Sequence, residues 1–327
     1  MTSSNADDRR GAWTGYWAAG ASHSCTGTYG ETYGGTIAQY WMAVFAGLSP
    51  GDRVLDLATG NAVLARMLLQ AHPLSDISCI GVDLSPVVPA WPDALPIAQR
   101  SRIEIRGGVD LARLPFEDGT FDLAMSQYGF EYCDSPAALS ELARVLRPDG
   151  RVAMVLHHAE GRPAWLAARE IDHLDWLLAP SGFLDAVETL LGPMARAATA
   201  AGREALKRDA SANAARERFN AILAEAASRE GDGADILFEA REAAMALFQS
   251  AAAQGIDAAR QRLDALGQAY RASRLRLLDL VEHALDAGAA QDLRSRLSLV
   301  VGRPAGLSFL EDQGHLMGWR LDLPGQV

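Results

Sequence analysis

Three acidic side chains, Asp56, Asp83 and Asp110, stand at or near the end of a short apolar run in this sequence. A carboxylate in that position can accept hydrogen bonds from both vicinal hydroxyls of a ribose, or from an exocyclic amine such as adenine N6. The small residues of the segment 58–62 let a ligand approach the backbone, and Gly60 tolerates a positive φ. The pattern predicts a nucleoside site. The alternatives are helix N-caps and a tight strand-to-helix turn that bind nothing.

Five apolar runs must position these side chains. They cover residues 53–58, 77–84, 102–107, 121–127 and 151–158, and each is bounded by Gly, Pro or Asp. Apolar strands separated by helix-length segments are typical of a parallel sheet that is covered on both faces. Ligands of such sheets bind outside the carboxyl ends of the strands. We therefore expect an α/β fold with a doubly wound, mostly parallel sheet and a site at that edge.

The chain changes character outside this core. Residues 1–48 are rich in aromatic residues, and residues 49–160 hold the five runs. Residues 161–298 show the apolar period of amphipathic helices. We expect four to six helices there, with breaks at 181–182, 231–233 and 255. Because strand character returns in residues 299–327, the helical block is predicted to be a large insertion after the fifth strand. It is a cap over an acceptor, a bundle that forms a homodimer, or both.

The amino-acid composition limits the classes of partner that the chain is expected to bind. The 327 residues are 49% hydrophobic and carry a formal net charge of −11, from 30 Lys and Arg against 41 Asp and Glu. A chain with this net negative charge is not expected to bind nucleic acid or an anionic membrane surface in general, because phosphate contacts need clustered cations. The polar N-terminus does not have the apolar core of a secretory signal, and no uninterrupted apolar stretch reaches about 18 residues. We expect a cytoplasmic protein with a small-molecule substrate.

Four stretches of sequence point to a known family. They are VLDLATGNAVLARML, GVDLSP, GGVDLARLPFEDGTFDLAMSQYGFEY and ELARVLRPDGRVAMV. Over about residues 50–160, and weakly in the final strands, the chain resembles the class I S-adenosylmethionine-dependent methyltransferases. It is most similar to their small-molecule branch, which includes the ubiquinone and menaquinone C-methyltransferases. A nicotinamide cofactor is disfavoured, since of Gly at 58, 60 and 63 only Gly60 is present.

The resemblance implies a Rossmann-like methyltransferase fold and S-adenosylmethionine as cofactor. It places the loop at Asp56 and Gly60 against the methionine part, Asp83 on the ribose hydroxyls and Gln127 near the sulfonium. Two departures are Ala58 and Ala62 in place of glycines, and four prolines that disrupt the usual helix after the second strand. The predicted cofactor-binding residues are Tyr16, Asp56, Ala58, Gly60, Asp83, Leu84, Asp110, Leu111 and Gln127.

Methyl transfer by in-line displacement needs an aligned acceptor, and a general base helps where the acceptor loses a proton. His157 and His158 end the fifth run, and alternation along a strand turns only one of them into the cleft. The alternative is that one caps the following helix and the other packs. Glu131 and Tyr128 are the next catalytic candidates, and His23 beside Cys25 could join them. No ligand spacing supports a metal.

Aromatic residues of the N-terminal segment have two interpretations. Trp13, Tyr16 and Trp17 could close as a lid over cofactor and acceptor, or could pack the segment onto the edge of the sheet. The leading function is S-adenosylmethionine-dependent methyl transfer to a small organic acceptor, such as a secondary metabolite. The alternatives are an enzyme that uses the same cofactor for other chemistry, and a non-catalytic binding protein. The leading interpretation requires Asp83 and Asp110 to share one crevice.

Overall fold

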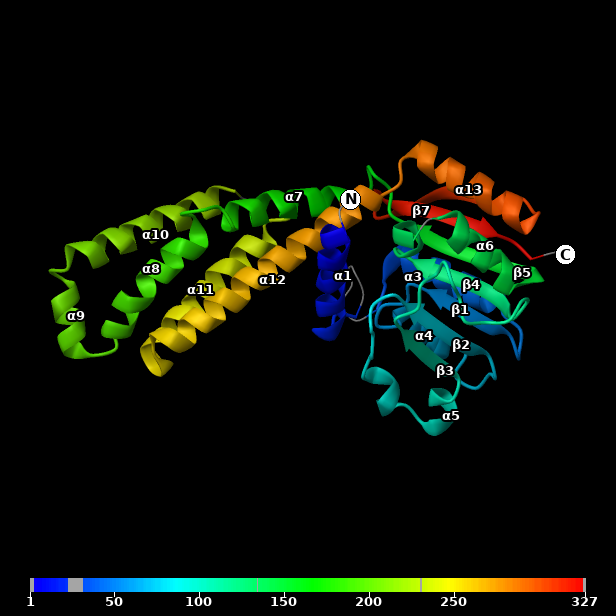
Figure 1. Ribbon diagram of the computed structural model, residues 1–327, viewed down its shortest axis with the longest axis horizontal. Coiled ribbons are helices and arrows are strands. Elements are labelled where there is room, and N and C mark those ends of the chain that lie inside the picture. Colours follow the sequence, from blue (N-terminus) through cyan, green and yellow to red (C-terminus); the bar gives the residue numbers. More distant parts are fainter. Residues whose placement is uncertain (1–2, 23–31, 134, 230, 326–327) are drawn as a thin grey trace. The chain divides into compact units, whose positions relative to one another are not determined.

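The computed structural model describes residues 3–22, 32–133, 135–229 and 231–325. The chain divides into two compact units, and Figure 1 labels the elements of both. Unit 1 comprises Met1–Trp165 and Asp279–Val327, and unit 2 comprises Leu166–Leu278. The segments of unit 1 flank unit 2 in the sequence, as an insertion requires.

A seven-stranded sheet forms the centre of unit 1, in the order β3-β2-β1-β4-β5-β7-β6. The first five strands are parallel, whereas β7 is antiparallel to both β5 and β6. The predicted α/β class with a mostly parallel sheet is confirmed. The strands are β1 Arg53–Leu57, β2 Ser78–Asp83, β3 Ile103–Gly107, β4 Phe121–Gln127, β5 Leu146–Leu156, β6 Gly306–Asp312 and β7 His315–Leu323.

Helices cover both faces of the sheet, because side chains alternate along each buried strand. Val54 of β1 packs with α3 (Gly35–Ala46) and α4 (Val63–Ala71). Leu55 and Leu57 pack on the opposite face with α6 (Pro136–Val145) and α13 (Ala287–Val301). A site that faces the carboxyl ends of β1, β4 and β5 therefore rests on two buried apolar layers.

The connection from β2 to β3 departs from a doubly wound pattern. It holds only the short elements η1 (Trp91–Ala94) and α5 (Ile97–Arg100). Pro86, Pro89, Pro92 and Pro96 explain this, since proline supplies no amide donor and disfavours a helical residue before it. The predicted disruption is thus confirmed.

The described part of unit 2 consists of helices and the turns that join them. Phe219 contacts both Phe183 and Phe248 in its core, where α8 packs against α10 and α11. Helix α7 begins and helix α12 ends in unit 1. The helices are α7 Arg162–Leu177, α8 Phe183–Arg196, α9 Ala200–Leu206, α10 Ala210–Ser228, α11 Asp235–Gln254 and α12 Ile256–His283.

Helix boundaries follow the predicted breaks, but the number of helices was underestimated. The described part of residues 161–298 holds or begins seven helices, α7 to α13, rather than four to six. The seven-residue α9 and the Asp286 N-cap that starts α13 account for the difference. Helix α13 runs to Val301 and packs on α6 and β6, so the prediction of strand character from residue 299 was wrong at its start. Within the described residues, no helix is long and apolar enough to cross a membrane.

Candidate active site

The loop between β1 and α4 is a tight bend of small residues. Ala58, Gly60 and Ala62 all have positive φ, at 54°, 51° and 61°. A left-handed conformation costs a residue with a Cβ about 1–2 kcal/mol. The two alanines therefore occupy positions that suit glycine, and the sheet holds them there. Backbone strain of this kind concentrates at functional sites.

Two buried carboxyl groups lie under this bend. Asp56 Oδ2 accepts a hydrogen bond from Thr59 Oγ1 at 2.5 Å. Asp83 accepts from the Gly60 amide at 2.9 Å and from the Ser85 amide at 2.8 Å. Burial raises the pKa of Asp56 to about 7, against the lowering effect of Thr59 and with a further rise from Asp83. Burial also raises the pKa of Asp83, outweighing its hydrogen bonds to Gly60 and Ser85.

The predicted adenine-side residues follow β3. The Val109 amide donates to the Asp83 carbonyl at 2.9 Å, which joins the ends of β2 and β3. Asp110 is exposed and accepts from the Ala112 amide at 2.9 Å. Leu111 is buried, whereas Leu84 is 42% exposed beside Asp83. An open apolar side chain next to the carboxylate is a surface on which a flat base can stack.

The acidic residues of the second and third strands end at the same edge of the sheet. Asp83 ends β2, and Asp110 follows β3, the strand that pairs with β2. Burial, and then the charges of Asp83, Glu131, Asp110 and Asp279 in that order, raise the pKa of the Cys133 thiol to about 12.

A buried histidine–carboxylate pair lies at the ends of β4 and β5. Glu131, in η2 (Phe130–Cys133), accepts from the His157 backbone amide at 2.8 Å, and its Oε1 is 2.7 Å from His157 Nδ1. An ionised carboxylate there fixes the proton on Nδ1 and leaves Nε2 as a base. Among the described residues, neither His157 Nε2 nor Glu131 Oε2 has a hydrogen-bond partner.

The other two catalytic candidates have different surroundings. His158 stacks on Trp319 with ring centroids 4.5 Å apart, and its Nδ1 accepts from the Glu160 amide at 2.9 Å. Burial lowers the pKa of His158, against the raising effect of Glu160. Tyr128 stacks on His157 at 4.2 Å and donates its hydroxyl to the Met317 carbonyl at 2.9 Å. The two histidines thus face opposite sides, and Tyr128 supports the ring of His157.

Gln127 ends β4 with its amide oriented by a neighbour. Trp41 Nε1 of α3 donates to Gln127 Oε1 at 2.5 Å. Gln127 Nε2 is buried and makes no hydrogen bond within the described part of the chain. An amide held at one end and unpaired at the other is a donor ready for a ligand.

Helix α1 (Ser3–Ala18) brings the N-terminal aromatic residues to this crevice. Trp13, Tyr16 and Trp17 contact one another, and Trp13 also contacts Tyr132 with centroids 5.6 Å apart. A Cβ placed on Gly60 would lie 2.7 Å from Trp17 Cη2, so the indole covers the bend. The cover comes from α1 and not from the loop's own side chains. His23 and Cys25 lie outside the described residues.

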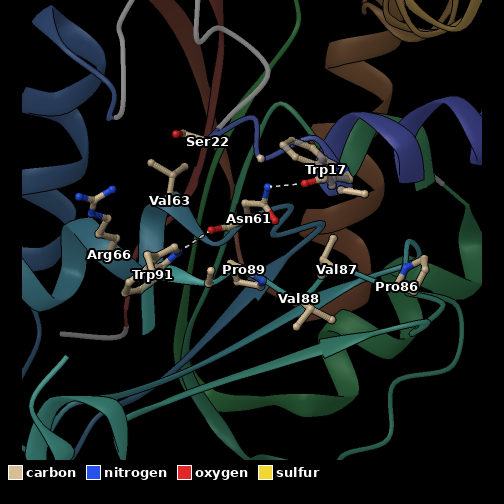
Figure 2. A pocket seen from close by; sticks show the side chains of 13 residues that line it. Trp17, Ser22, Asn61, Val63, Arg66, Pro86, Val87, Val88, Pro89 and Trp91 are labelled. Carbon is tan, nitrogen blue, oxygen red and sulfur yellow. Dashed lines mark hydrogen bonds between the residues drawn. The ribbon is translucent and has the colours of Figure 1, made fainter. Parts of the chain in front are cut away.

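Two cavities border the covered bend. One of about 30 Å³ lies among Trp13, Trp17, Asp56, Ala58 and Gln127. The other, of about 510 Å³, lies between the end of α1, the start of α4 and the proline-rich loop (Figure 2). In it Asn61 donates to the Trp17 carbonyl at 3.0 Å, and Trp91 donates to the Asn61 carbonyl at 2.8 Å. Neither Asp83 nor Asp110 lines the larger cavity.

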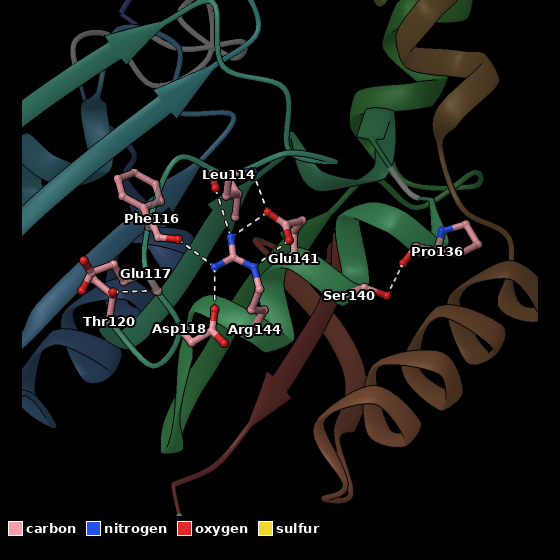
Figure 3. A network of polar contacts seen from close by, with 9 residues as sticks. All are labelled: Leu114, Phe116, Glu117, Asp118, Thr120, Pro136, Ser140, Glu141 and Arg144. Carbon is pink, nitrogen blue, oxygen red and sulfur yellow. Dashed lines mark hydrogen bonds and ion pairs between the residues drawn. The ribbon is translucent and has the colours of Figure 1, made fainter.

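An arginine network holds the segment that follows Asp110. Arg144 of α6 donates to the carbonyls of Leu114 and Phe116 and pairs with Glu141 and Asp118 (Figure 3). The Leu114 amide donates to Glu141 at 2.8 Å. The stretch LPFED that carries part of the family resemblance is thus a scaffold, which fixes the loop behind Leu111.

Sequence reasoning missed the residues that α12 contributes. Asp279 and His283 lie beside Trp13 and Tyr132, about 270 residues along the chain from α1. Burial raises the pKa of Asp279, but hydrogen bonds from His283, Trp13 and Arg9 outweigh it and hold the pKa below its usual value. The signal was a single carboxylate inside the apolar stretch LLDLV.

The comparisons with known proteins match the part of the chain that holds the first five strands. Residues 54–150 match a family described as "Methyltransferase domain". A demethylmenaquinone methyltransferase of Thermus thermophilus is 39% identical over 110 residues, which cover 32% of this chain and 46% of that protein. The enzyme of the same name from Mycolicibacterium gilvum is 39% identical over 108 residues, 33% of this chain and 42% of that protein.

These similarities are confined to the core of unit 1. The chain spans less than half the length of the curated relatives it matches. A solved methyltransferase of Aquifex aeolicus is 20% identical to this chain, with a TM-score of 0.36 over 46% of this chain and 75% of that one. Residues 54–150 therefore match a methyltransferase domain and are distantly related to the corresponding part of the demethylmenaquinone methyltransferases.

Proposed function

We propose that this chain transfers a methyl group from S-adenosylmethionine to a small organic acceptor that gives up a proton, with His157 as general base. The observation that carries the base assignment is the buried pair of His157 and Glu131, whose Nδ1 and Oε1 are 2.7 Å apart. The acceptor atom is one that carries a proton, such as a hydroxyl oxygen or an acidic carbon, because a tertiary amine or a thioether has no proton to lose.

The residues on the nucleoside side fit the cofactor. Gly60 and its small neighbours allow close approach, and Asp83 has oxygen lone pairs beyond its two amide bonds for ribose hydroxyls. Gln127 offers an unpaired buried amide donor. When bound, S-adenosylmethionine supplies a methyl carbon that the acceptor attacks, and the carbon–sulfur bond breaks with its electron pair on sulfur.

On the acceptor side, His157 removes the proton of the acceptor. Glu131 holds His157 with Nδ1 protonated, and Nε2 takes the proton of the acceptor as the new bond to carbon forms. Stacking on Tyr128 fixes the ring plane of the imidazole. A general base in such a position contributes about 10²–10⁴-fold to rate. We assign His158 a structural role, because its ring packs on Trp319 and its Nδ1 accepts the Glu160 amide.

Two measurements test the proposal in order. Isothermal titration calorimetry with S-adenosylmethionine and S-adenosylhomocysteine should give saturable binding to the full chain. Incubation with S-adenosylmethionine and fractionated metabolite pools should then yield a product heavier by one methyl group, about 14 Da, by mass spectrometry. Absence of binding by either nucleoside would exclude the enzyme, and binding without any methylated product would favour a non-catalytic role.

The role of the helical unit stays a prediction. Its two interpretations, a cap over the acceptor and a dimerisation bundle, do not exclude each other, and the molar mass in solution, measured by light scattering, tests the second. A mass near 70 kDa, twice the 35.0 kDa of the chain, would indicate the dimer.

A further inference from the structure

The bend that should receive the cofactor is covered by a side chain of the protein itself. Cη2 and Cζ2 of Trp17 lie 2.7 and 2.8 Å from where a Cβ of Gly60 would be. Asn61, in the same loop, donates to the carbonyls of Trp17 and Ala21 at 3.0 and 2.7 Å. The loop thus binds the end of α1 with its own amide group.

The space that remains under α1 is too small for a nucleoside. The cavity among Trp13, Trp17, Asp56, Ala58 and Gln127 has a volume of about 30 Å³. That volume holds about two water molecules. Pockets for small molecules and cofactors have roughly 300–1,000 Å³. A ligand can therefore reach these residues only when the indole of Trp17 has moved.

A buried ionic contact fixes α1 in this position. Arg9 pairs with Asp279 at 2.9 Å and with Glu282 at 2.6 Å, and Trp13 Nε1 donates to the second oxygen of Asp279 at 2.8 Å. The side chains of Arg9 and Asp279 are only 9% and 10% exposed. The residues around Asp279 are themselves fixed to the sheet, because the Leu285 amide donates to the His157 carbonyl at 2.9 Å.

We propose that α1 is an autoinhibitory plug, in which Trp17 occupies the cofactor's place over Gly60 and the contact of Arg9 with Asp279 holds the helix there. This inference rests on the proposed function, since it takes the nucleoside site to be the crevice at Gly60 and Asp83. It differs from a lid that closes over bound cofactor. A lid lines the ligand and adds affinity, whereas a plug competes with the ligand and lowers its apparent affinity.

Competition between α1 and the cofactor changes the apparent dissociation constant of the cofactor. If only a fraction of molecules has α1 displaced, the apparent dissociation constant is the intrinsic one divided by that fraction. A substitution that weakens the Arg9 contact raises the fraction and tightens apparent binding. The gain comes from faster association, because the intrinsic site is unchanged.

The experiment compares two arginines of the same helix. Arg9→Ala removes the contact with Asp279, and Arg10→Ala removes an equal charge from an exposed neighbour. Binding of S-adenosylhomocysteine is measured by calorimetry and by stopped-flow tryptophan fluorescence. Arg9→Ala should bind about tenfold more tightly than wild type with a faster association rate. Arg10→Ala should bind within about twofold of wild type.

A second measurement needs no variant. Amide hydrogen exchange of α1 in the wild-type chain should become faster when S-adenosylhomocysteine is added at saturating concentration, because displacement exposes the helix. Slower exchange of α1, or weaker binding by Arg9→Ala, would overturn the plug and indicate a lid. If wild type binds and Arg9→Ala is unchanged, the plug fails while the proposed function stands. If neither chain binds, the proposed function fails and the plug with it.

Discussion

The nucleoside site and the helix that covers it are held in place in different ways. Asp56, Gly60 and Asp83 each lie within a few residues of a buried strand end, so the sheet itself sets their positions. Helix α1 is instead held by side-chain contacts, and that of Arg9 with Asp279 joins positions 270 residues apart. The site is therefore part of the sheet, whereas the proposed plug requires only that the contacts of its cover break.

The largest effect on activity should come from substitution of the proposed general base, His157. His157→Gln should lower kcat about 10²–10⁴-fold while the affinity for S-adenosylhomocysteine stays within about twofold, because His157 lies on the acceptor side. Steady-state rates of methyl transfer to the acceptor measure kcat, and calorimetry measures the affinity for S-adenosylhomocysteine. His158→Gln is the matched control and should keep most of the activity. Equal losses in both variants would contradict the assignment of the base to His157.

On the nucleoside side, a substitution should change the affinity for the ligand. Asp83→Ala should weaken S-adenosylhomocysteine about 100-fold, since it removes an acceptor of charge-assisted hydrogen bonds. Calorimetry measures the change. Asp76→Ala is the control, because Asp76 accepts from the Gly51 amide before β1, at the amino end of the sheet. If Asp83→Ala binds as wild type does, the ribose lies elsewhere.

A smaller effect should appear in stability against pH. An unfolded aspartate releases its proton near about pH 4, whereas buried Asp56 keeps it to about pH 7. The folded chain therefore binds more protons between these values, so its stability falls as pH rises through the window and stays low above it. Asp56→Asn should flatten this fall and raise Tm at pH 8 by roughly 5 °C.

Thermal unfolding at a series of pH values measures the effect. In Asp56→Asn the fall of Tm with rising pH should be smaller than in wild type. It should not disappear, because burial also raises the pKa of Asp83. A variant whose Tm at pH 8 is below that of wild type would contradict a buried carboxyl that resists ionisation.

The smallest effect concerns the bend itself. Ala58→Gly and Ala62→Gly should each stabilise the fold by about 0.5–1 kcal/mol, because glycine adopts a positive φ without steric cost. Denaturant titration measures the free energy of unfolding. Ala65→Gly, within helix α4, is the control and should destabilise by at least about 1 kcal/mol. Destabilisation by all three would show that the alanine methyl groups of the bend are needed for packing.

The sequence predicted where Asp56, Gly60 and Asp83 lie in the fold for a physical reason. Continuous apolar runs located the strands, and the position of Asp83 at a strand end follows from the strand itself. Asp279 was not predicted, because its partners Arg9 and Trp13 come from a separate helix and only the folded chain brings them together. The same holds for Trp17, whose place over Gly60 depends on how α1 packs. Alternation did predict that His157 and His158 face opposite sides.

A crystal structure of the full chain with S-adenosylhomocysteine would test whether the nucleoside binds at Asp83 and Gly60 and whether Trp17 leaves when it does. We predict that the ribose hydroxyls bind Asp83, that the amino-acid part lies over Gly60, and that the indole of Trp17 has left that position. A nucleoside bound away from Asp83, or Trp17 still packed on Gly60 with ligand present, would contradict the account.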